Sequence, residues 1–235
     1  MPSAFGQFAA AGSVIAVLWL WRHRRGVGVS DNEFWAAIWL LVLSGIVGAK
    51  ALFVVLGHAH YERGELRLWA DFGVGFVFFG GLLGALLAGV LFAWCRRLSF
   101  VRGADYFAVA VPLGHAIGRL GCYAAGCCHG RDGIPVQLYE ACGLLLIALV
   151  TRAALTRIES GEWTRGAAIR WYLVLYGTLR VVLDPLRGDG RPERFSGFSH
   201  QQGLALLVVG LAVWWWLGSR RDPIARRSGP ARRVS

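Results

Sequence analysis

The sequence predicts an all-α protein that crosses a membrane seven times. Of its 235 residues, 56% are hydrophobic. Only 17% are charged, below the roughly 25% usual in soluble proteins. The mean hydropathy is +0.50, and the charges fall in short runs between apolar stretches of membrane-spanning length. This composition excludes a disordered chain and an ordinary soluble domain.

Seven apolar stretches come close to the roughly 20 residues that a helix needs to cross the hydrocarbon layer. They are predicted at 4–21, 34–57, 72–94, 104–118, 136–151, 167–184 and 201–218. Asp105, Pro112 and His115 interrupt the fourth stretch, and the fifth is short. Because no linker separates domains, we expect a single transmembrane bundle over 1–219, followed by a disordered basic cytoplasmic tail at 220–235.

The distribution of basic residues predicts the orientation of the chain. Sixteen Lys and Arg residues lie at 22–33, 95–103, 152–170 and in the C-terminal tail, against seven in the N-terminus and the alternate connections. Since cytoplasmic loops are enriched in Lys and Arg, the C-terminus is predicted to be cytoplasmic and the N-terminus outside. Topology then explains the net charge of +11, and we expect no nucleic-acid partner. The polar, glycine-rich connections at 118–135 and 184–200 would share the outer face.

Small residues at a spacing of four predict where two helices pack, because they let backbones approach closely. They form ridges of Gly80, Gly84 and Ala88, of Gly81, Ala85 and Gly89, and of Ser44 and Gly48. A second interpretation of Gly80 and Gly81 is that they leave room for a lipid chain.

Ionisable residues inside apolar stretches are costly unless they are paired or line a hydrated cavity. Four stand out in this sequence: Lys50, His115, Arg119 and Arg180. A guanidinium offers a fork of donors that matches phosphate and carboxylate groups. Two arginines on different helices near one membrane face therefore predict a site for an anionic headgroup. The alternative for Arg180 is a structural salt bridge with Asp184 on the same helix face.

Six short motifs, in the same order along the chain, resemble those of the prolipoprotein diacylglyceryl transferase family. The segment PLGHAIGRLGCYAAG at 112–126 is similar to the family's G-R-x-G-N-F-x-N-G-E pattern, and PVQLYE at 135–140 to H-P-x-Q-L-Y-E. YGTLRVVLD at 176–184, continued by Arg187, resembles Y-G-x-x-R-F-x-x-E. The remaining three matches are GAK at 48–50 to G-x-R, FGGL at 79–82 to H-G-G-L, and SHQQ at 199–202 to S-x-x-Q.

The resemblance implies a multi-pass enzyme of the bacterial cytoplasmic (inner) membrane. Such an enzyme moves the diacylglyceryl group of phosphatidylglycerol to the lipobox cysteine of a prolipoprotein signal peptide, and neither a cofactor nor a metal is expected. Arg119 and Arg180 are assigned to the phosphate. The other substrate-binding positions carried over are Gly80, Gly81, Gly118, Gly121, Cys122, Gln137, Tyr139, Glu140, Asp184 and Arg187.

The sequence departs from the family pattern. Phe79 replaces the histidine of H-G-G-L, Cys122 replaces an asparagine and Cys127 a glutamate. A base must take the proton of the incoming thiol, because the thiolate is the nucleophile. His115, one turn before the first arginine of the site, is the predicted catalytic base, and His129 is the second candidate; a structural or solvated histidine is the alternative for each. A protein that lacks a base would be a non-catalytic lipid-binding or redox protein on the same fold.

The segment Cys122-Tyr-Ala-Ala-Gly-Cys127-Cys128-His129 concentrates three of the five cysteines. Its spacing differs from the usual zinc pattern, in which two close pairs of ligands lie apart in the sequence. Thiols that fill small buried spaces, a disulfide, an acyl-accepting or redox thiol, and a metal site all remain open interpretations.

Overall fold

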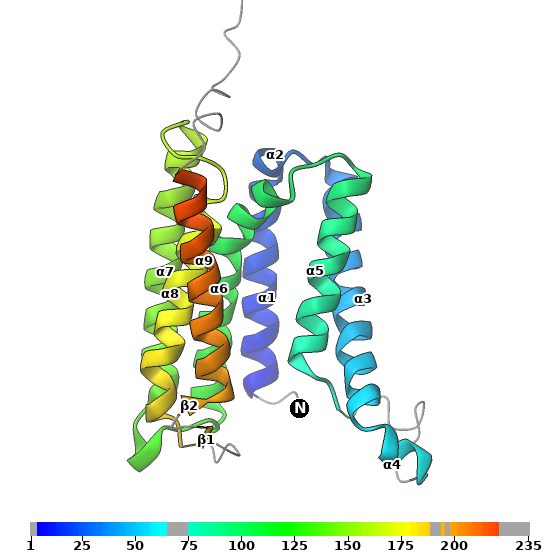
Figure 1. Cartoon of the computed structure of the whole chain (residues 1–235), viewed down its shortest axis with the longest axis vertical. Helices are drawn as coiled ribbons and strands as arrows, with labels where there is room; N and C mark the ends of the chain where they lie inside the picture. Colours follow the sequence, from blue (N-terminus) through cyan, green and yellow to red (C-terminus); the bar gives the residue numbers. More distant parts are fainter. Residues whose placement is uncertain (1–3, 65–74, 189–193, 196–197, 221–235) are drawn as a thin grey trace, which may run out of the picture. The chain divides into compact units, whose positions relative to one another are not determined.

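The computed structural model describes residues 4–64, 75–188, 194–195 and 198–220, and the all-α class is confirmed (Figure 1). The chain forms two compact units, residues 24–100 and residues 1–23 together with 101–235. One bundle over 1–219 stays a prediction. The predicted basic tail lies outside the described residues, apart from Arg220.

The unit formed by residues 24–100 is built on two long helices. Its elements are α2 (Arg24–Val27), α3 (Asp31–Leu56), α4 (His58–Glu62) and α5 (Phe78–Cys95). Ser30 and Glu33 begin α3 with a capping box: the Ser30 N–H donates to Glu33 Oε2 at 2.9 Å, and the Glu33 N–H donates to Ser30 Oγ at 3.4 Å. These contacts satisfy two of the N–H groups that every helix start leaves unpaired.

Helices α3 and α5 touch along Ser44, Gly48, Gly80 and Gly84, which we call the small-residue interface. A Cβ atom on Gly48 would lie 2.4 Å from the Gly80 carbonyl oxygen, and one on Gly84 would lie 2.4 Å from the Ser44 carbonyl oxygen. Only glycine permits such an approach of two backbones. The packing predicted from the ridges of small residues is therefore confirmed.

The described residues of the other unit form five long helices. Its elements are α1 (Ala4–Arg22), α6 (Phe100–Ala124), η1 (Arg131–Gly133), α7 (Val136–Glu159), α8 (Ala167–Leu183), η2 (Asp184–Leu186), β1 (Arg194–Phe195), β2 (Phe198–Ser199) and α9 (His200–Arg220). Helix α8 packs against both α7 and α9 (Figure 1), and β1 and β2 form a short antiparallel pair.

Helix α1 approaches α6 closely at two places. A Cβ atom on Gly12 would lie 2.5 Å from the Gly114 carbonyl oxygen. A Cβ atom on Gly121 would lie 2.5 Å from Phe8 Cβ. The structure therefore gives Gly121, carried over as a substrate-binding position, a packing contact with α1.

Within the described residues, each of the seven predicted stretches overlaps one long helix. Two helices extend well past the predicted bounds: α6 extends beyond 104–118 at both ends, and α7 continues past residue 151. Four helices, α1, α3, α5 and α7, are long and apolar enough to cross a membrane by length and composition. We therefore describe the chain as a multi-pass membrane protein.

Helix α6 contains a polar residue whose partners hydropathy does not reveal. The Asp105 carboxylate accepts hydrogen bonds from the backbone N–H groups of Gly166, at 2.6 Å, and Ile169, at 3.1 Å. Asp105 thus caps the start of α8 from a neighbouring helix. Pro112 lies inside α6, where the helix continues past it.

Candidate functional site

A single buried carboxylate gathers three arginines at one end of the larger unit. Glu140, near the start of α7, is 2% exposed. Its Oε2 lies 2.9 Å from Arg119 Nε and 3.3 Å from Arg187 Nη1, and its Oε1 lies 3.1 Å from Arg180 Nη1. We call these four side chains the arginine cluster. The structure therefore pairs Arg180 with a carboxylate on another helix.

Three segments distant in the sequence supply the arginine cluster, around Arg119, Glu140 and 180–187. Arg119 lies near the end of α6, Arg180 in the last turn of α8 and Arg187 directly after η2. Arg187 forms a β-bridge with Gly130, and the Gly188 N–H donates to the His129 carbonyl at 3.0 Å. The described parts of the two glycine-rich connections therefore lie against each other, at the same end of this unit.

The charge of the arginine cluster suits an anion. Its four side chains carry a net charge of +2, and Arg119 and Arg187 are buried. Removing charges from water is costly unless an opposite charge compensates them. Arg180 is the most accessible of the three, with its side chain 22% exposed. A Cβ atom on Gly118, the residue before Arg119, would meet nothing within 4 Å.

His115 reaches the arginine cluster through a tyrosine. Its half-buried ring lies 5.9 Å from the Tyr176 ring, centroid to centroid. The Tyr176 hydroxyl accepts a hydrogen bond from Arg180 Nε at 2.9 Å, and the Tyr172 ring stacks on Tyr176 at 5.6 Å. Sequence reasoning missed Tyr176 as a site residue. Its position four residues before Arg180, on the same helix face, was the available signal.

Gln137 holds the loop that follows α6. The side chain is fully buried, and its Nε2 donates to the Cys127 carbonyl at 2.7 Å. The same Nε2 lies 3.3 Å from His129 Nδ1, while His129 Nε2 lies 2.7 Å from the Gly126 carbonyl. A proton on His129 Nε2 satisfies both contacts, since Nδ1 then accepts and Nε2 donates. His129 therefore bonds both to its own loop and to Gln137 of α7.

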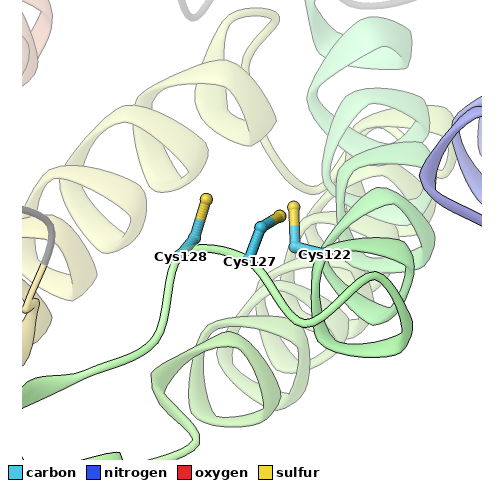
Figure 2. A group of neighbouring side chains, drawn as sticks. All are labelled: Cys122, Cys127 and Cys128. Atoms are coloured by element: carbon cyan, nitrogen blue, oxygen red, sulfur yellow. The ribbon is translucent and has the colours of Figure 1, made fainter.

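The same loop brings three thiols together beside the arginine cluster. The Sγ atoms of Cys122, Cys127 and Cys128 all lie within 4.8 Å of one another (Figure 2), and we call them the cysteine cluster. Arg119 Nη1 lies 3.9 Å from Cys122 Sγ. Desolvation and the neighbouring thiols raise the pKa of Cys127 to about 11. Cys127 is therefore a neutral thiol near pH 7, which weakens its case as an acyl-accepting nucleophile.

Other substrate-binding positions predicted from the resemblance are not among the side chains that pair with Glu140. Gly80 and Gly81 contact α3 in the other unit, where Phe79 is exposed in the first turn of α5. Tyr139 is 52% exposed on α7. Asp184 ends α8, its N–H donating to the Arg180 carbonyl.

Lys50, the fourth ionisable residue of the apolar stretches, is buried in α3. Its Nζ lies 5.4 Å from the centre of the Phe53 ring and 5.7 Å from that of Phe76. The charge of Lys50 is therefore stabilised in part by aromatic faces within its own unit.

The sequence matches known proteins over nearly its whole length. The sequence model of the prolipoprotein diacylglyceryl transferase family covers residues 3–217. A phosphatidylglycerol–prolipoprotein diacylglyceryl transferase of Clostridium tetani is 24% identical over 232 residues, 89% of this chain and 91% of the relative. Proteins of the same name in Bordetella bronchiseptica (31% over 213 residues; 83% and 75%) and Dehalococcoides mccartyi (27% over 243 residues; 92% and 89%) are also similar. The chain belongs to the prolipoprotein diacylglyceryl transferase family.

Proposed function

We propose that this protein transfers the diacylglyceryl group of phosphatidylglycerol to the lipobox cysteine of a prolipoprotein. The observation that carries the proposal is the arginine cluster, in which three guanidinium groups surround one buried carboxylate. A phosphodiester headgroup supplies the negative charge that this arrangement favours. The names of the related proteins specify the same two substrates.

The reaction changes the charge of the phosphate, and the arginine cluster suits the product. The thiol sulfur attacks the glyceryl carbon that carries the phosphate. A C–S bond forms, the C–O bond breaks with its electron pair passing to the phosphate oxygen, and glycerol phosphate leaves. The phosphate charge grows from −1 in the diester towards −2 in the monoester. A cluster with net charge +2 therefore binds the transition state more tightly than the substrate, which is how electrostatics accelerate a reaction.

The residues of the site divide this work between them. Arg119 and Arg180 hold the phosphate, and Arg187 adds a third positive charge. Each guanidinium has five N–H groups, so binding an oxygen anion does not require breaking its pair with Glu140. Glu140 is a positioning residue: it fixes the direction of the guanidinium groups without contacting the substrate.

His115 is the base of this proposal, because Phe79 occupies the family's histidine position and cannot accept a proton. The imidazole contacts Tyr176, which in turn binds Arg180, so it lies next to the phosphate-binding group. It would take the thiol proton as the C–S bond forms. His129 is the weaker candidate, since both of its ring nitrogens have partners, the Gly126 carbonyl and Gln137 Nε2.

A transfer assay tests the proposal directly. Purified full-length protein is mixed with vesicles of labelled phosphatidylglycerol and a lipobox peptide, with the B. bronchiseptica relative assayed in parallel and a Cys→Ser peptide as control. We expect a diacylglyceryl thioether on the cysteine peptide and release of glycerol phosphate. If the relative forms product while this protein binds lipid without turnover, the protein is a non-catalytic lipid-binding member of the family.

The site would act outside the cytoplasm. We infer seven membrane spans in a bacterial cytoplasmic membrane, with the N-terminus outside and the C-terminus inside, from the asymmetry of Lys and Arg between alternate connections. A cytoplasmic reporter fused after Ser235 is expected to be active and a periplasmic one inactive. Activity of the periplasmic fusion would contradict both the topology and the outward-facing site.

A further inference from the structure

The loop after α6 turns back so that its cysteines meet the end of the helix. Helix α6 ends at Ala124, and Gly126 has a φ of +65° that glycine adopts without strain. The Cys127 N–H then donates to the Cys122 carbonyl at 3.1 Å. This bond brings Cys127 back to the last turn of the helix, close to Cys122.

Cys128 completes the cluster through an uncommon backbone conformation. Its φ is +62°, in the left-handed region that L residues other than glycine adopt at a cost. In an extended chain, consecutive side chains point to opposite sides. Here, by contrast, Cys127 and Cys128 both place their Sγ atoms in one group with Cys122 (Figure 2).

We propose that the cysteine cluster binds one thiophilic cation of the Zn²⁺ or Cu(I) class. A tetrahedral zinc site has Zn–S bonds of about 2.3 Å, which places its sulfur atoms about 3.8 Å apart. The Sγ atoms already lie within 4.8 Å of one another, so small side-chain rotations close the site. Each thiol releases its proton to solvent as its sulfur bonds the ion. Soft thiolates favour these metals over Mg²⁺ or Ca²⁺.

The surroundings complement a site of this kind. Three thiolates and one divalent cation carry a net charge of −1, and Arg119 Nη1 lies 3.9 Å from Cys122 Sγ. Buried Gln137 fixes the Cys127 carbonyl and contacts His129, so it orders the loop that supplies two ligands. Because His129 is engaged in these contacts, three thiolates leave the fourth position of the ion open.

The presence of three neighbouring sulfur atoms is explained better by a metal site than by a disulfide. A disulfide joins two of the thiols at about 2.0 Å and leaves the third without a role. The three Sγ atoms instead lie within 4.8 Å of one another, one from the end of α6 and two from the loop. The proposal does not depend on transferase activity, because it concerns metal binding alone.

Cobalt titration of the reduced full-length protein in detergent micelles, under anaerobic conditions, tests the site. We expect one equivalent of Co²⁺ to bind with a sulfur-to-cobalt charge-transfer band, and Zn²⁺ to displace it. Loss of one sulfur ligand should weaken Co²⁺ binding by at least about 100-fold. Mutating a residue that only contacts a metal ligand already costs up to about 100-fold in affinity. The variants are Cys122→Ser, Cys127→Ser and Cys128→Ser. The exposed Cys95 and Cys142 provide matched Cys→Ser controls that should bind as the unaltered protein does.

A second measurement needs no variant. Zn²⁺ should slow the alkylation of half-buried Cys127 and Cys128 by N-ethylmaleimide, while exposed Cys95 and Cys142 react at an unchanged rate. Absence of Co²⁺ binding by the reduced protein would overturn the proposal, as would equal binding without Cys127. Equal alkylation of all sites with and without Zn²⁺ would overturn it too.

Discussion

The small-residue interface and the arginine cluster hold helices together in opposite ways. Between α3 and α5, glycines remove side chains so that backbone packs on backbone; the Gly48 and Gly80 positions leave no room for a methyl group. In the larger unit, α6, α7 and α8 instead meet through long charged side chains around Glu140. Lipid tails provide no hydrophobic force between helices, so helices within a membrane associate through close packing and through polar contacts.

The two regions should therefore fail for different reasons. The small-residue interface is damaged by added atoms, whereas the arginine cluster is damaged by a lost charge or a lost hydrogen-bond geometry. Only the arginine cluster should control turnover, because it is the group that contacts the phosphate in the proposed reaction. Four variants, taken from the largest expected effect to the smallest, test this distinction.

Glu140→Gln should have the largest effect. It leaves three guanidinium groups around a neutral amide, and breaking a buried ion pair costs about 3–5 kcal/mol. We expect a large loss of unfolding free energy in micelles together with loss of transfer. The control is Glu159→Gln, whose side chain is 38% exposed and pairs with Arg152 at 3.4 Å; exposed pairs contribute about 0–1 kcal/mol. Equal destabilisation by both changes would contradict a central role for Glu140.

His115→Gln should reduce turnover more than it reduces stability. A positioned general base contributes about 10²–10⁴-fold to a rate, so we expect transfer to fall by about that factor or more, with phosphatidylglycerol binding retained. His129→Gln is the matched comparison and should have the smaller effect on rate. Transfer kinetics and vesicle binding, measured on both variants, decide between them. The reverse order would move the base into the loop after α6.

Arg119→Lys should lower transfer by about 10²–10³-fold, the usual effect of losing one donor to a developing anion. The lysine ammonium keeps the charge but cannot reproduce the planar fork. Arg152→Lys, at an exposed position on α7, should leave the rate unchanged. Initial rates at saturating lipid provide the measurement. Full activity of Arg119→Lys would reject the phosphate role, while unfolding without a specific rate defect would favour a structural one.

Gly48→Ala should have the smallest effect of the four, on stability alone. Its Cβ would lie 2.4 Å from the Gly80 carbonyl oxygen, so α3 and α5 must separate, and overpacking typically costs about 1–3 kcal/mol. Gly210→Ala in α9 is the control, because a Cβ there meets nothing within 4 Å. Thermal unfolding of both variants provides the comparison. If the two Ala variants unfold alike, the close approach of α3 and α5 is not needed for stability.

The same contrast explains what the sequence could predict. The α3–α5 contact could be predicted from the spacing of small residues at every fourth position within each helix. The long helices could likewise be predicted from the length of the apolar stretches. The arginine cluster combines residues from distant segments. Arg119 and Arg180 were predicted because isolated charges in apolar stretches are conspicuous. The central position of Glu140 was not predicted, because nothing local to it shows that three arginines converge there.

Two further differences have the same origin. Hydropathy treats Asp105 as a defect inside the predicted fourth stretch, at 104–118, although the carboxylate caps α8. Gly121 was assigned to substrate through the family motif, and the structure adds that its missing side chain admits Phe8 of α1. In both cases the residue makes a contact between helices that one-dimensional patterns do not contain.

The cap formed by Asp105 also gives α6 and α8 a common register. Fourteen positions separate Asp105 from Arg119 on α6, and fourteen separate Gly166 from Arg180 at α8. At 1.5 Å per residue both intervals measure about 21 Å. The two helices are thus connected at two levels about 21 Å apart. At one level Asp105 caps α8, and at the other Arg119 and Arg180 both pair with Glu140. Inserting or deleting one residue between these two levels in either helix would rotate one of its contact residues by about 100° about the helix axis and break that contact. We therefore expect these two segments to tolerate substitutions far better than changes in length.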